Sequence, residues 1–300
     1  MPDKPGKRFG DEPSFWRRLR AAPKMLRLHL VKGRQYIDLD YRVRPRVRYG
    51  HGEPPNPHLQ ALLERGRGGY RDLLGRLMQF REQFGAIPYE TDDPAEPCWA
   101  NTYIPPLDGM SIYGLLALNR PARLLEIGSG NSTKFARRAV ADHDLPTRIT
   151  SIDPLPRAEC DALCDRVVRS RLEDADLTIF DELAVGDVLY MDGSHRCFQN
   201  SDVTVFFLDV LPRVADGVVV AMHDIFLPWD YPPRWLKRFY SEQYVLAAHL
   251  LGAGERFEVV LPNYFVSQDE ELSAMVSPLS QLPALGGREI EGWLLWFRQG

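Results

Sequence analysis

The sequence has few cysteines and no long apolar run, and both shortages exclude whole classes of protein. Four cysteines in 300 residues are too few for a dense disulfide framework. The longest apolar runs, such as residues 218–222, fall far short of the roughly 18 residues that a membrane-spanning helix needs. The apolar segment 25–31 is interrupted by Arg27 and His29, which does not fit an export signal. We therefore expect a cytoplasmic protein without a transmembrane segment.

Apolar residues are not scarce: they make up 44% of the chain. This is enough to build a core, and it excludes disordered and collagen-like classes. Charge, however, is distributed unevenly. Residues 1–50 contain 14 Lys and Arg against 5 Asp and Glu, a net charge of +9, and the remaining residues contain 23 basic and 36 acidic side chains, a net charge of −13. We therefore distinguish a basic N-terminal arm, residues 1–50, from an acidic body.

The end of this arm alternates arginine with other residues. Every second residue from Arg42 to Arg48 is an arginine, so an extended chain would present these side chains on one face. Such a face suits an anionic surface, for example acidic lipid or a polyanionic glycan. The alternative is that the arm docks on the acidic body of its own chain or of a second copy in a homo-oligomer. No nucleic-acid-binding motif accompanies the basic residues, so nucleic acid is not an expected partner.

Residues 51–120 are expected to form a helical cap and a lead-in to the main domain. Leucines recur at helical spacing over residues 58–84, and the glycine-rich stretch 66–69 divides this segment into two helices. A further helix is expected over residues 111–118. It leads directly into the main domain, residues 121–300.

From residue 121, short apolar runs alternate with polar helical segments, which is typical of a parallel sheet wound with helices. We therefore predict an α/β fold with a Rossmann-like, doubly wound and mostly parallel sheet. In such sheets ligands bind beyond the carboxyl ends of the strands, so the residues that follow each strand are candidates for a site. The expected strands are 123–127, 148–152, 167–170, 188–191 and 218–221, and the expected helices are 133–143, 157–165, 179–183 and 201–211.

The first predicted strand ends in a glycine turn that opens a helix. The glycines allow a ligand to approach the backbone, and the free N–H groups of the helix start favour a negative group. A dinucleotide fingerprint would have a third glycine where Thr133 stands, and the carboxylate of Glu126 would repel a pyrophosphate. The turn therefore favours a cofactor with positively charged groups. The candidate cofactor residues here are Glu126, Gly128, Ser129, Gly130 and Asn131.

Asp153 follows the second predicted strand. A carboxylate at this place can accept hydrogen bonds from two adjacent ribose hydroxyls. Together with Glu126 it predicts a site for an adenosyl cofactor, and the alternative is that Asp153 caps the next helix. Residues 171–174, after the third strand, include acids that could meet the adenine amino group.

The fourth and fifth predicted strands are each followed by an aspartate and a histidine. Asp192 and His195 follow the fourth strand, and His223 and Asp224 follow the fifth. Because neighbouring parallel strands end at one edge of the sheet, these four titratable side chains are expected to converge in one crevice. The alternative is that each histidine is a hydrogen-bonded structural group.

With these strand ends, residues 124–132, 149–154, 187–195 and 218–233 resemble a class I S-adenosylmethionine-dependent methyltransferase. The most similar variety is a bacterial small-molecule group whose strands end in Asp-Gly-x-His and His-Asp-Ile. The resemblance covers roughly residues 100–300. It implies a seven-stranded sheet whose last two strands, here 257–262 and 292–298, form an antiparallel hairpin around an insertion, 263–291. It also implies that Glu126 and the glycine turn hold the methionine moiety of the cofactor, and that Asp153 holds its ribose.

The implied reaction is methyl transfer to a hydroxyl of a small-molecule or saccharide-like acceptor. The enzyme must align the acceptor oxygen with the sulfonium methyl group and remove the hydroxyl proton. His195 or His223 fits the role of base, and Asp192 is a candidate both for catalysis and for cofactor binding. Some related O-methyltransferases use a divalent metal such as Mg²⁺, and Asp192 and Asp224 stand at the positions of its Asp ligands. A third oxygen ligand, which hard ions usually require, is not identifiable, so metal dependence stays open.

The acceptor pocket is expected to involve aromatic and polar side chains near the catalytic edge. Trp229 and Tyr231 lie on a proline- and aromatic-rich loop after the fifth strand, and Tyr103 and Asp108 precede the main domain. The alternative for this loop is that its tryptophans anchor the following helix, expected over 235–250, on the body.

Other classes of function also stay open at the level of the sequence. His195, His223 and one carboxylate could form the iron site of an oxygenase, and the fold could serve as a catalytically idle binding module. A nicotinamide oxidoreductase is the least favoured class. Cys160 and Cys164, four residues apart on a predicted helix, have no metal or redox partners at matching spacing and are expected to pack in the core.

Overall fold

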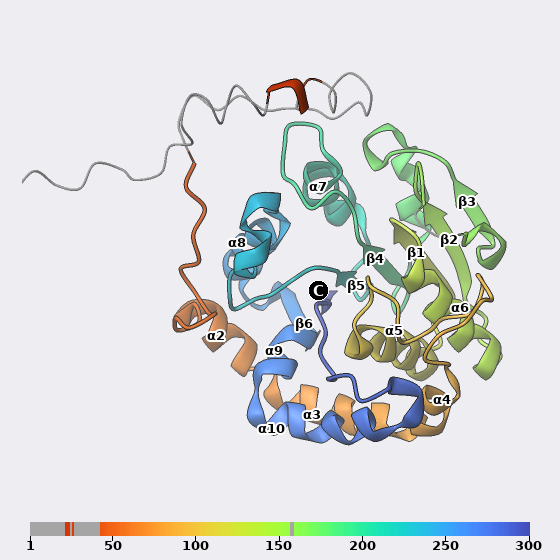
Figure 1. The fold of residues 1–300 in the computed structure, drawn as a ribbon. Coiled ribbons are helices and arrows are strands. Elements are labelled where there is room, and N and C mark those ends of the chain that lie inside the picture. Colours follow the sequence, from red (N-terminus) through yellow and green to blue (C-terminus); the bar gives the residue numbers. More distant parts are fainter. Residues whose placement is uncertain (1–21, 25, 27–42, 157–158) are drawn as a thin grey trace, which may run out of the picture. The chain divides into compact units, whose positions relative to one another are not determined.

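The computed structural model describes residues 22–24, 26, 43–156 and 159–300. The chain divides into two compact units, Met1–Arg44 and Pro45–Gly300, and the sheet lies in the second unit (Figure 1). Most of the basic arm lies outside the described residues, so its boundary and its role stay predictions. Within the described part of the chain, no helix is long and apolar enough to cross a bilayer.

Seven strands form one sheet in the order β3-β2-β1-β4-β5-β7-β6. Their bounds are Arg123–Ile127 (β1), Arg148–Ile152 (β2), Arg166–Val168 (β3), Val188–Met191 (β4), Val219–Met222 (β5), Phe257–Pro262 (β6) and Leu295–Gln299 (β7). β1 pairs in parallel with β2 and β4, whereas β7 is antiparallel to both β5 and β6. The predicted Rossmann-like, mostly parallel sheet is confirmed, including its antiparallel last strand.

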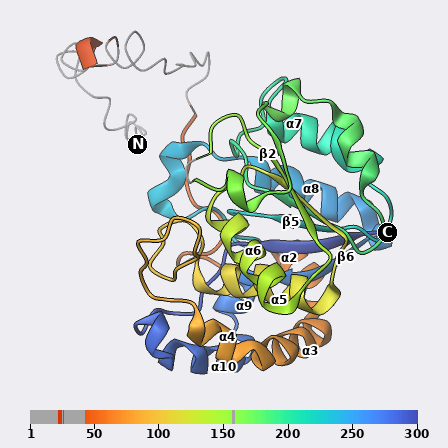
Figure 2. The same cartoon turned by 90° about the vertical axis from the view of Figure 1, so that its right-hand side faces the viewer.

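Helices cover both faces of this sheet. They are α2 (Pro57–Glu64), α3 (Arg67–Leu77), α4 (Arg81–Ala86), α5 (Pro106–Asn119), α6 (Asn131–His143), α7 (Asp202–Val205), α8 (Glu242–Ala253), α9 (Asn263–Gln268) and α10 (Glu270–Val276). Figure 2 shows the sheet between α5 and α6 on one side and α7 and α8 on the other. Along β1, Leu124 packs in the core on one face and Leu125 in the core on the other, because successive strand residues point to opposite sides.

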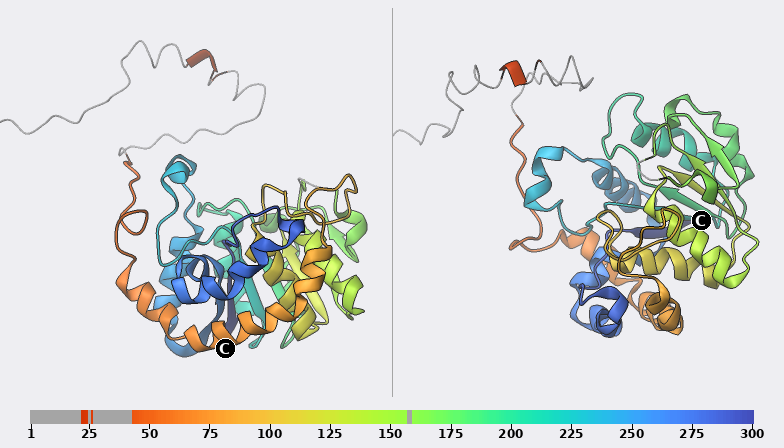
Figure 3. Two further views of the ribbon diagram at one scale, coloured as in Figure 1. Left: turned by 60° about the horizontal axis from the view of Figure 1, so that its bottom comes forward. Right: turned by 45° about the vertical axis from the view of Figure 1, so that its right-hand side comes forward.

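The segment before β1 and the insertion before β7 pack together, although they are far apart in the sequence. α3 contacts α5, β6 and α10, and Figure 3 shows α3 and α4, in orange, beside the blue insertion helices. Ion pairs join the two segments: Arg67 lies 2.6 Å from Asp269, and Arg71 lies 2.5 Å from Glu271. The cap helices therefore extend one core of the main domain instead of building a core of their own.

The helix expected after β2 is not formed among the described residues of its range. The expected range was 157–165, and the structure has a single 3-10 turn, Asp161–Leu163, there. Cys160 is buried beside this turn and Cys164 is half-buried, and both are free thiols. The next expected helix, 179–183, is also a 3-10 turn, Leu177–Glu182.

The helix expected from residue 235 begins seven residues later, at Glu242. Pro232 precedes a 3-10 turn that begins at the next proline, Pro233–Arg238, and Phe239 then adopts a left-handed conformation with a φ of +55°. A left-handed residue breaks the path of a right-handed helix. This break places Glu242 at the start of α8, next to the ends of β4 and β5.

Candidate functional site

A cavity of about 440 Å³ lies at the carboxyl edge of the sheet. Its walls come from the residues that follow β1, β2, β3 and β4, which is the edge at which a ligand was expected. Six of the seven predicted cofactor residues line it, namely Gly128, Ser129, Gly130, Asn131, Asp153 and Asp192. The seventh, Glu126, is buried and does not line the cavity.

The turn after β1 approaches the end of β4 closely. Gly128 has a φ of +80°, and a Cβ added to it would lie 2.0 Å from the carbonyl oxygen of Asp192. The backbone N–H of Asp192 in turn donates to the carbonyl of Ile127 at 2.9 Å. Glycine is the residue that fits both the positive φ and the lack of space, so the shape of the cavity floor depends on it.

Glu126 supports the same turn from below. Its Oε2 accepts a 2.6 Å hydrogen bond from the hydroxyl of Thr133, and that hydroxyl accepts a 3.0 Å bond from the backbone N–H of Gly130. Burial raises the pKa of Glu126 to about 7, and the hydrogen bond from Thr133 opposes this rise. Thr133, which replaces the third glycine of a dinucleotide fingerprint, thus links a strand carboxylate to the cofactor turn.

Asp153 also contacts the turn. Its Oδ2 accepts a 2.9 Å bond from the backbone N–H of Ser129, and its Oδ1 accepts a 2.7 Å bond from that of Leu155. Each carboxylate oxygen keeps a second lone pair, and the residue faces the cavity. Leu172 and Glu173, after β3, complete this end of the cavity wall.

His195 is held from three directions. Its Nδ1 lies 2.5 Å from Oε1 of Glu242, its ring stacks on Tyr240 with centroids 4.4 Å apart, and its Nε2 points toward two aspartates. Burial lowers the pKa of His195, but Glu242, Asp192 and Asp224 outweigh burial and raise it to about 9.

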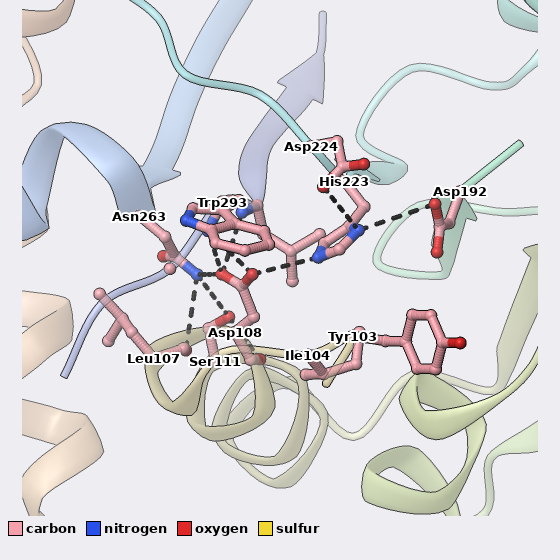
Figure 4. Close-up of polar contacts among 12 residues, drawn as sticks. Tyr103, Ile104, Leu107, Asp108, Ser111, Asp192, His223, Asp224, Asn263 and Trp293 are labelled. Carbon is pink, nitrogen blue, oxygen red and sulfur yellow. Dashed lines mark hydrogen bonds and ion pairs between the residues drawn. The ribbon is translucent and has the colours of Figure 1, made fainter. Parts of the chain in front are cut away.

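His223 is held by a second carboxylate, that of Asp108. His223 Nε2 lies 3.3 Å from Asp108 Oδ2 (Figure 4). Asp108 is fully buried and also accepts hydrogen bonds from Asn263 Nδ2 and from the backbone N–H groups of Trp293 and Leu294. Burial opposes protonation of His223, yet Asp224 and Asp192 raise its pKa well above the usual value.

Asp192 and Asp224 lie between the two imidazoles. Asp192 Oδ1 is 3.5 Å from His195 Nε2 and 3.6 Å from His223 Nδ1, and the oxygens of Asp224 lie at nearly the same distances from these atoms. The strand ends thus bring all four predicted titratable side chains together. Burial raises the pKa of Asp224, and His223 and His195 oppose this rise.

The described residues contain no group of three or more His, Cys, Asp or Glu side chains that could hold a metal ion. Asp192 and Asp224, the two residues considered as Mg²⁺ ligands, lie close together at the ends of β4 and β5, and metal dependence stays open. Both carboxylates face the imidazoles of His195 and His223, at 3.5–3.6 Å.

The residues expected near the acceptor lie in different surroundings. Tyr103 is half exposed and lines the cofactor cavity. Tyr231 is buried against Phe226, and Trp229 packs against Tyr264. Asp108 is enclosed as described above. Of the residues proposed for the acceptor, Tyr103 is the one that faces the cavity.

Two residues of the site were not found from the sequence. Glu242 lies on the helix expected over 235–250, in which it is the only acidic residue, and this lone acid at the start of an apolar helix was the available signal. Asn263 carried no signal, because its role depends on the packing of the insertion against α5.

The strand order with its antiparallel β7, and the cavity beyond β1, β2 and β4, have the arrangement that the resemblance to class I methyltransferases implied. Residues 125–225 match the family model Methyltransf_24, a methyltransferase domain. This match includes the glycine turn, Asp153 and the aspartate–histidine ends of β4 and β5. This match to a methyltransferase domain supports the enzyme class expected from the sequence.

No curated protein matches the chain. Several solved structures are weakly similar to it. The plantazolicin methyltransferase BpumL in complex with SAH has 12% identity and a TM-score of 0.42, covering 81% of this chain and 99% of that chain. An O-methyltransferase from Bacillus cereus in complex with SAH has 15% identity and a TM-score of 0.39, covering 76% and 91%. A Podospora anserina methyltransferase, PaMTH1, bound to SAH has 14% identity and a TM-score of 0.39, covering 84% and 100%.

Proposed function

We propose that the protein transfers the methyl group of S-adenosylmethionine to a hydroxyl oxygen of a small-molecule acceptor, with His195 as the general base. The observation that carries the proposal is the position of His195 directly after Gly193 and Ser194, two residues of the cavity wall. A cofactor in this cavity would hold its methyl group next to the cluster of histidines and aspartates.

The cavity wall suggests how each part of the cofactor would bind. The glycine turn and the free N–H groups at the start of α6 would hold the methionine carboxylate. Asp153 would accept hydrogen bonds from the ribose hydroxyls, and Leu172 and Glu173 would contact the adenine. Asp192 would face the positively charged sulfonium, an arrangement that a neutral side chain could not support as well.

His195 is favoured over His223 as the base because of its surroundings. Neither His223 nor its chain neighbours line the cavity, whereas the residues immediately before His195 do. His223 Nε2 is directed at Asp108, a carboxylate that also organises β7 and α9. We therefore assign to His223 the role of a charged neighbour of Asp192 and Asp224.

In the proposed reaction, the acceptor oxygen forms a bond to the methyl carbon while the carbon–sulfur bond breaks. The electron pair of that bond stays on sulfur and leaves a neutral thioether, and the hydroxyl proton passes to Nε2 of His195. In the free protein the pKa of His195 is raised to about 9. The positive charge of the bound cofactor lowers this pKa, so cofactor binding makes the base available.

Cofactor binding is tested first by isothermal titration of S-adenosylmethionine into the protein, with NAD as a comparison ligand. We expect Asp153→Ala to weaken binding by about 10- to 100-fold, because hydrogen bonds to a charged group contribute about 1.5–3 kcal/mol. The matched control is Asp216→Ala, which removes an exposed aspartate at the opposite end of β5. No heat with S-adenosylmethionine, or equal affinity of the Asp153 variant, would contradict the assignment.

The acceptor class is tested with panels of phenols, sugars and polyols and with S-adenosylmethionine that carries a labelled methyl group. We expect an O-methyl ether by mass spectrometry. We also expect His195→Gln to slow its formation at least about 100-fold, the lower end of what a general base contributes, while cofactor affinity stays within twofold. Products methylated only on nitrogen or sulfur would refute the hydroxyl acceptor.

A further inference from the structure

We propose that Glu242 is a positioning residue: it holds His195 by Nδ1 so that Nε2 faces the acceptor hydroxyl. This inference rests on the proposed role of His195 as the base. It concerns a side chain on α8, outside all the strand ends that the sequence singled out.

The contact between the two residues is short and buried. Glu242 is fully buried, and its Oε1 lies 2.5 Å from Nδ1 of His195. Its other oxygen, Oε2, is buried without a hydrogen-bond partner among the described residues. A buried carboxylate with a single partner is costly to maintain. A residue that served stability alone would be better replaced by an apolar side chain or fully bonded, so this isolation favours a functional role.

The backbone around the pair is tied together as well. The N–H of Ser241 donates to the carbonyl of His195 at 2.8 Å, and the hydroxyl of Ser241 accepts a 2.8 Å bond from the N–H of Cys197. His195 itself has a φ of +65°, an uncommon conformation for a residue with a side chain. The start of α8 therefore fixes both the backbone and the ring of the histidine.

The direction of each ring nitrogen follows from these contacts. A carboxylate accepts a hydrogen bond from N–H, so the pair with Glu242 places a proton on Nδ1 and leaves the lone pair of the neutral imidazole on Nε2. Tyr240 stacks on the face of the ring and prevents it from turning. Nε2 is then aimed at the space between Asp192 and Asp224.

His223 offers an internal comparison. Its carboxylate partner, Asp108, accepts three further hydrogen bonds from Asn263, Trp293 and Leu294, so Asp108 has a structural task besides its histidine. Glu242 has no such task among the described contacts. Asp108 lies 3.3 Å from its histidine and is shared with other donors, whereas Glu242 forms a 2.5 Å hydrogen bond with His195 and has no other side-chain partner among the described residues.

The test compares Glu242→Gln with the wild type by NMR of 15N-labelled histidine and by the pH dependence of methyl transfer. The titratable groups that face His195 are Glu242 from α8, Tyr240 just before α8, Asp192 from the end of β4 and Asp224 from the end of β5. Removing the charge of Glu242 leaves fewer anions to favour the imidazolium. We expect the pKa of His195 to fall by at least one unit and the acid limb of the rate profile to move to lower pH by a similar amount. The pKa of His223 in the same sample is the internal control.

We also expect kcat to fall about 100-fold at its optimum pH, with the affinity for S-adenosylmethionine unchanged within twofold. Glu242→Asp, which keeps the charge, should retain the pKa of His195 more closely than the glutamine variant does. Glu182→Gln is the matched control for the chemical change, because Glu182 is an exposed glutamate that pairs with Arg166. An equal loss at every pH with an unmoved pKa would overturn the proposal and leave the methyltransferase function standing. If the wild type fails to bind S-adenosylmethionine, the proposed function itself fails, whatever the NMR titration shows.

Discussion

At Gly128 a single missing side chain decides whether the cofactor turn can form. The φ of +80° and the 2.0 Å approach to the carbonyl oxygen of Asp192 both require glycine. The sequence indicated that this glycine allows a ligand to come close. The structure adds that its nearest neighbour is the protein's own backbone at the end of β4. Gly128 therefore allows the ends of β1 and β4 to approach each other, and it also leaves the backbone of the turn open to a ligand.

We predict that Gly128→Ala weakens both the fold and cofactor binding. The steric overlap with Asp192 must be relieved by a backbone shift, which we expect to lower the free energy of unfolding by about 2–4 kcal/mol. Gly186→Ala separates the two causes, because Gly186 also has a positive φ, +86°, but no atom within 4 Å of an added Cβ. It should lose about 1 kcal/mol and keep cofactor affinity. Urea unfolding and titration calorimetry measure both effects, and equal losses in the two variants would contradict the steric argument.

Among the elements, α5 connects the cap to the catalytic edge. Asp108, in its first turn, accepts hydrogen bonds from the backbone of residues 293 and 294, just before β7, and from Asn263 at the start of α9. Ser111, one turn further, accepts bonds from Asn263 and from the indole of Trp296. The first turn of α5 thus contacts the residue after β6, the residues before β7 and His223.

We predict that Asp108→Ala is among the most destabilising substitutions on α5. It leaves buried donors without an acceptor, and each such group costs about 1–3 kcal/mol, so we expect a loss of at least about 3 kcal/mol in urea unfolding. Asp93→Ala is the matched control, because Asp93 accepts one exposed backbone bond, from Ala95. It should lose less than about 1 kcal/mol. A loss below 1 kcal/mol for Asp108→Ala would show that the network contributes little.

The elements differ in how closely their bounds follow from the local sequence. Strands β1, β2 and β4 have the predicted bounds, because buried parallel strands appear as apolar runs bounded by turn residues. Among the described residues of the range 157–165 the expected helix is not formed: Cys160 and Cys164 are spaced for a helix but lie on either side of a 3-10 turn, Asp161–Leu163. The spacing of residues in the sequence does not show how little length is available for the segment that connects two strands, and this length depends on the tertiary structure.

At the scale of the whole molecule, buried groups with raised pKa values make stability depend on pH. The pKa of His195 is about 9, against an ordinary value of 6.5, and that of Glu126 is about 7, against 4.5. In both cases the folded state binds protons that the unfolded state has released. The contribution of His195 to the free energy of unfolding is therefore fully present below pH 6.5 and is lost as the pH rises through 9. The contribution of Glu126 is lost between pH 4.5 and 7.

We predict that the free energy of unfolding falls between pH 6.5 and pH 9, by the order of 3 kcal/mol from His195. Urea unfolding at several pH values measures it. His195→Gln should flatten the decline, because glutamine does not titrate. Increasing stability across this range, or an unchanged slope in the variant, would refute the assignment of the raised pKa to His195.

The sequence by itself determined the sheet, the position of the cofactor turn and the convergence of Asp192, His195, His223 and Asp224. These follow from local patterns: apolar runs define strands, and the carboxyl ends of neighbouring parallel strands meet at one edge. Only the tertiary structure decided which carboxylate holds each histidine. Asp108 and Glu242 reach the site from α5 and α8, and they lie 115 and 47 residues from their histidines in the chain. Such pairings depend on how helices pack at the edge of the sheet. The spacing of residues in one sequence does not show which distant helix end will lie beside a given strand end.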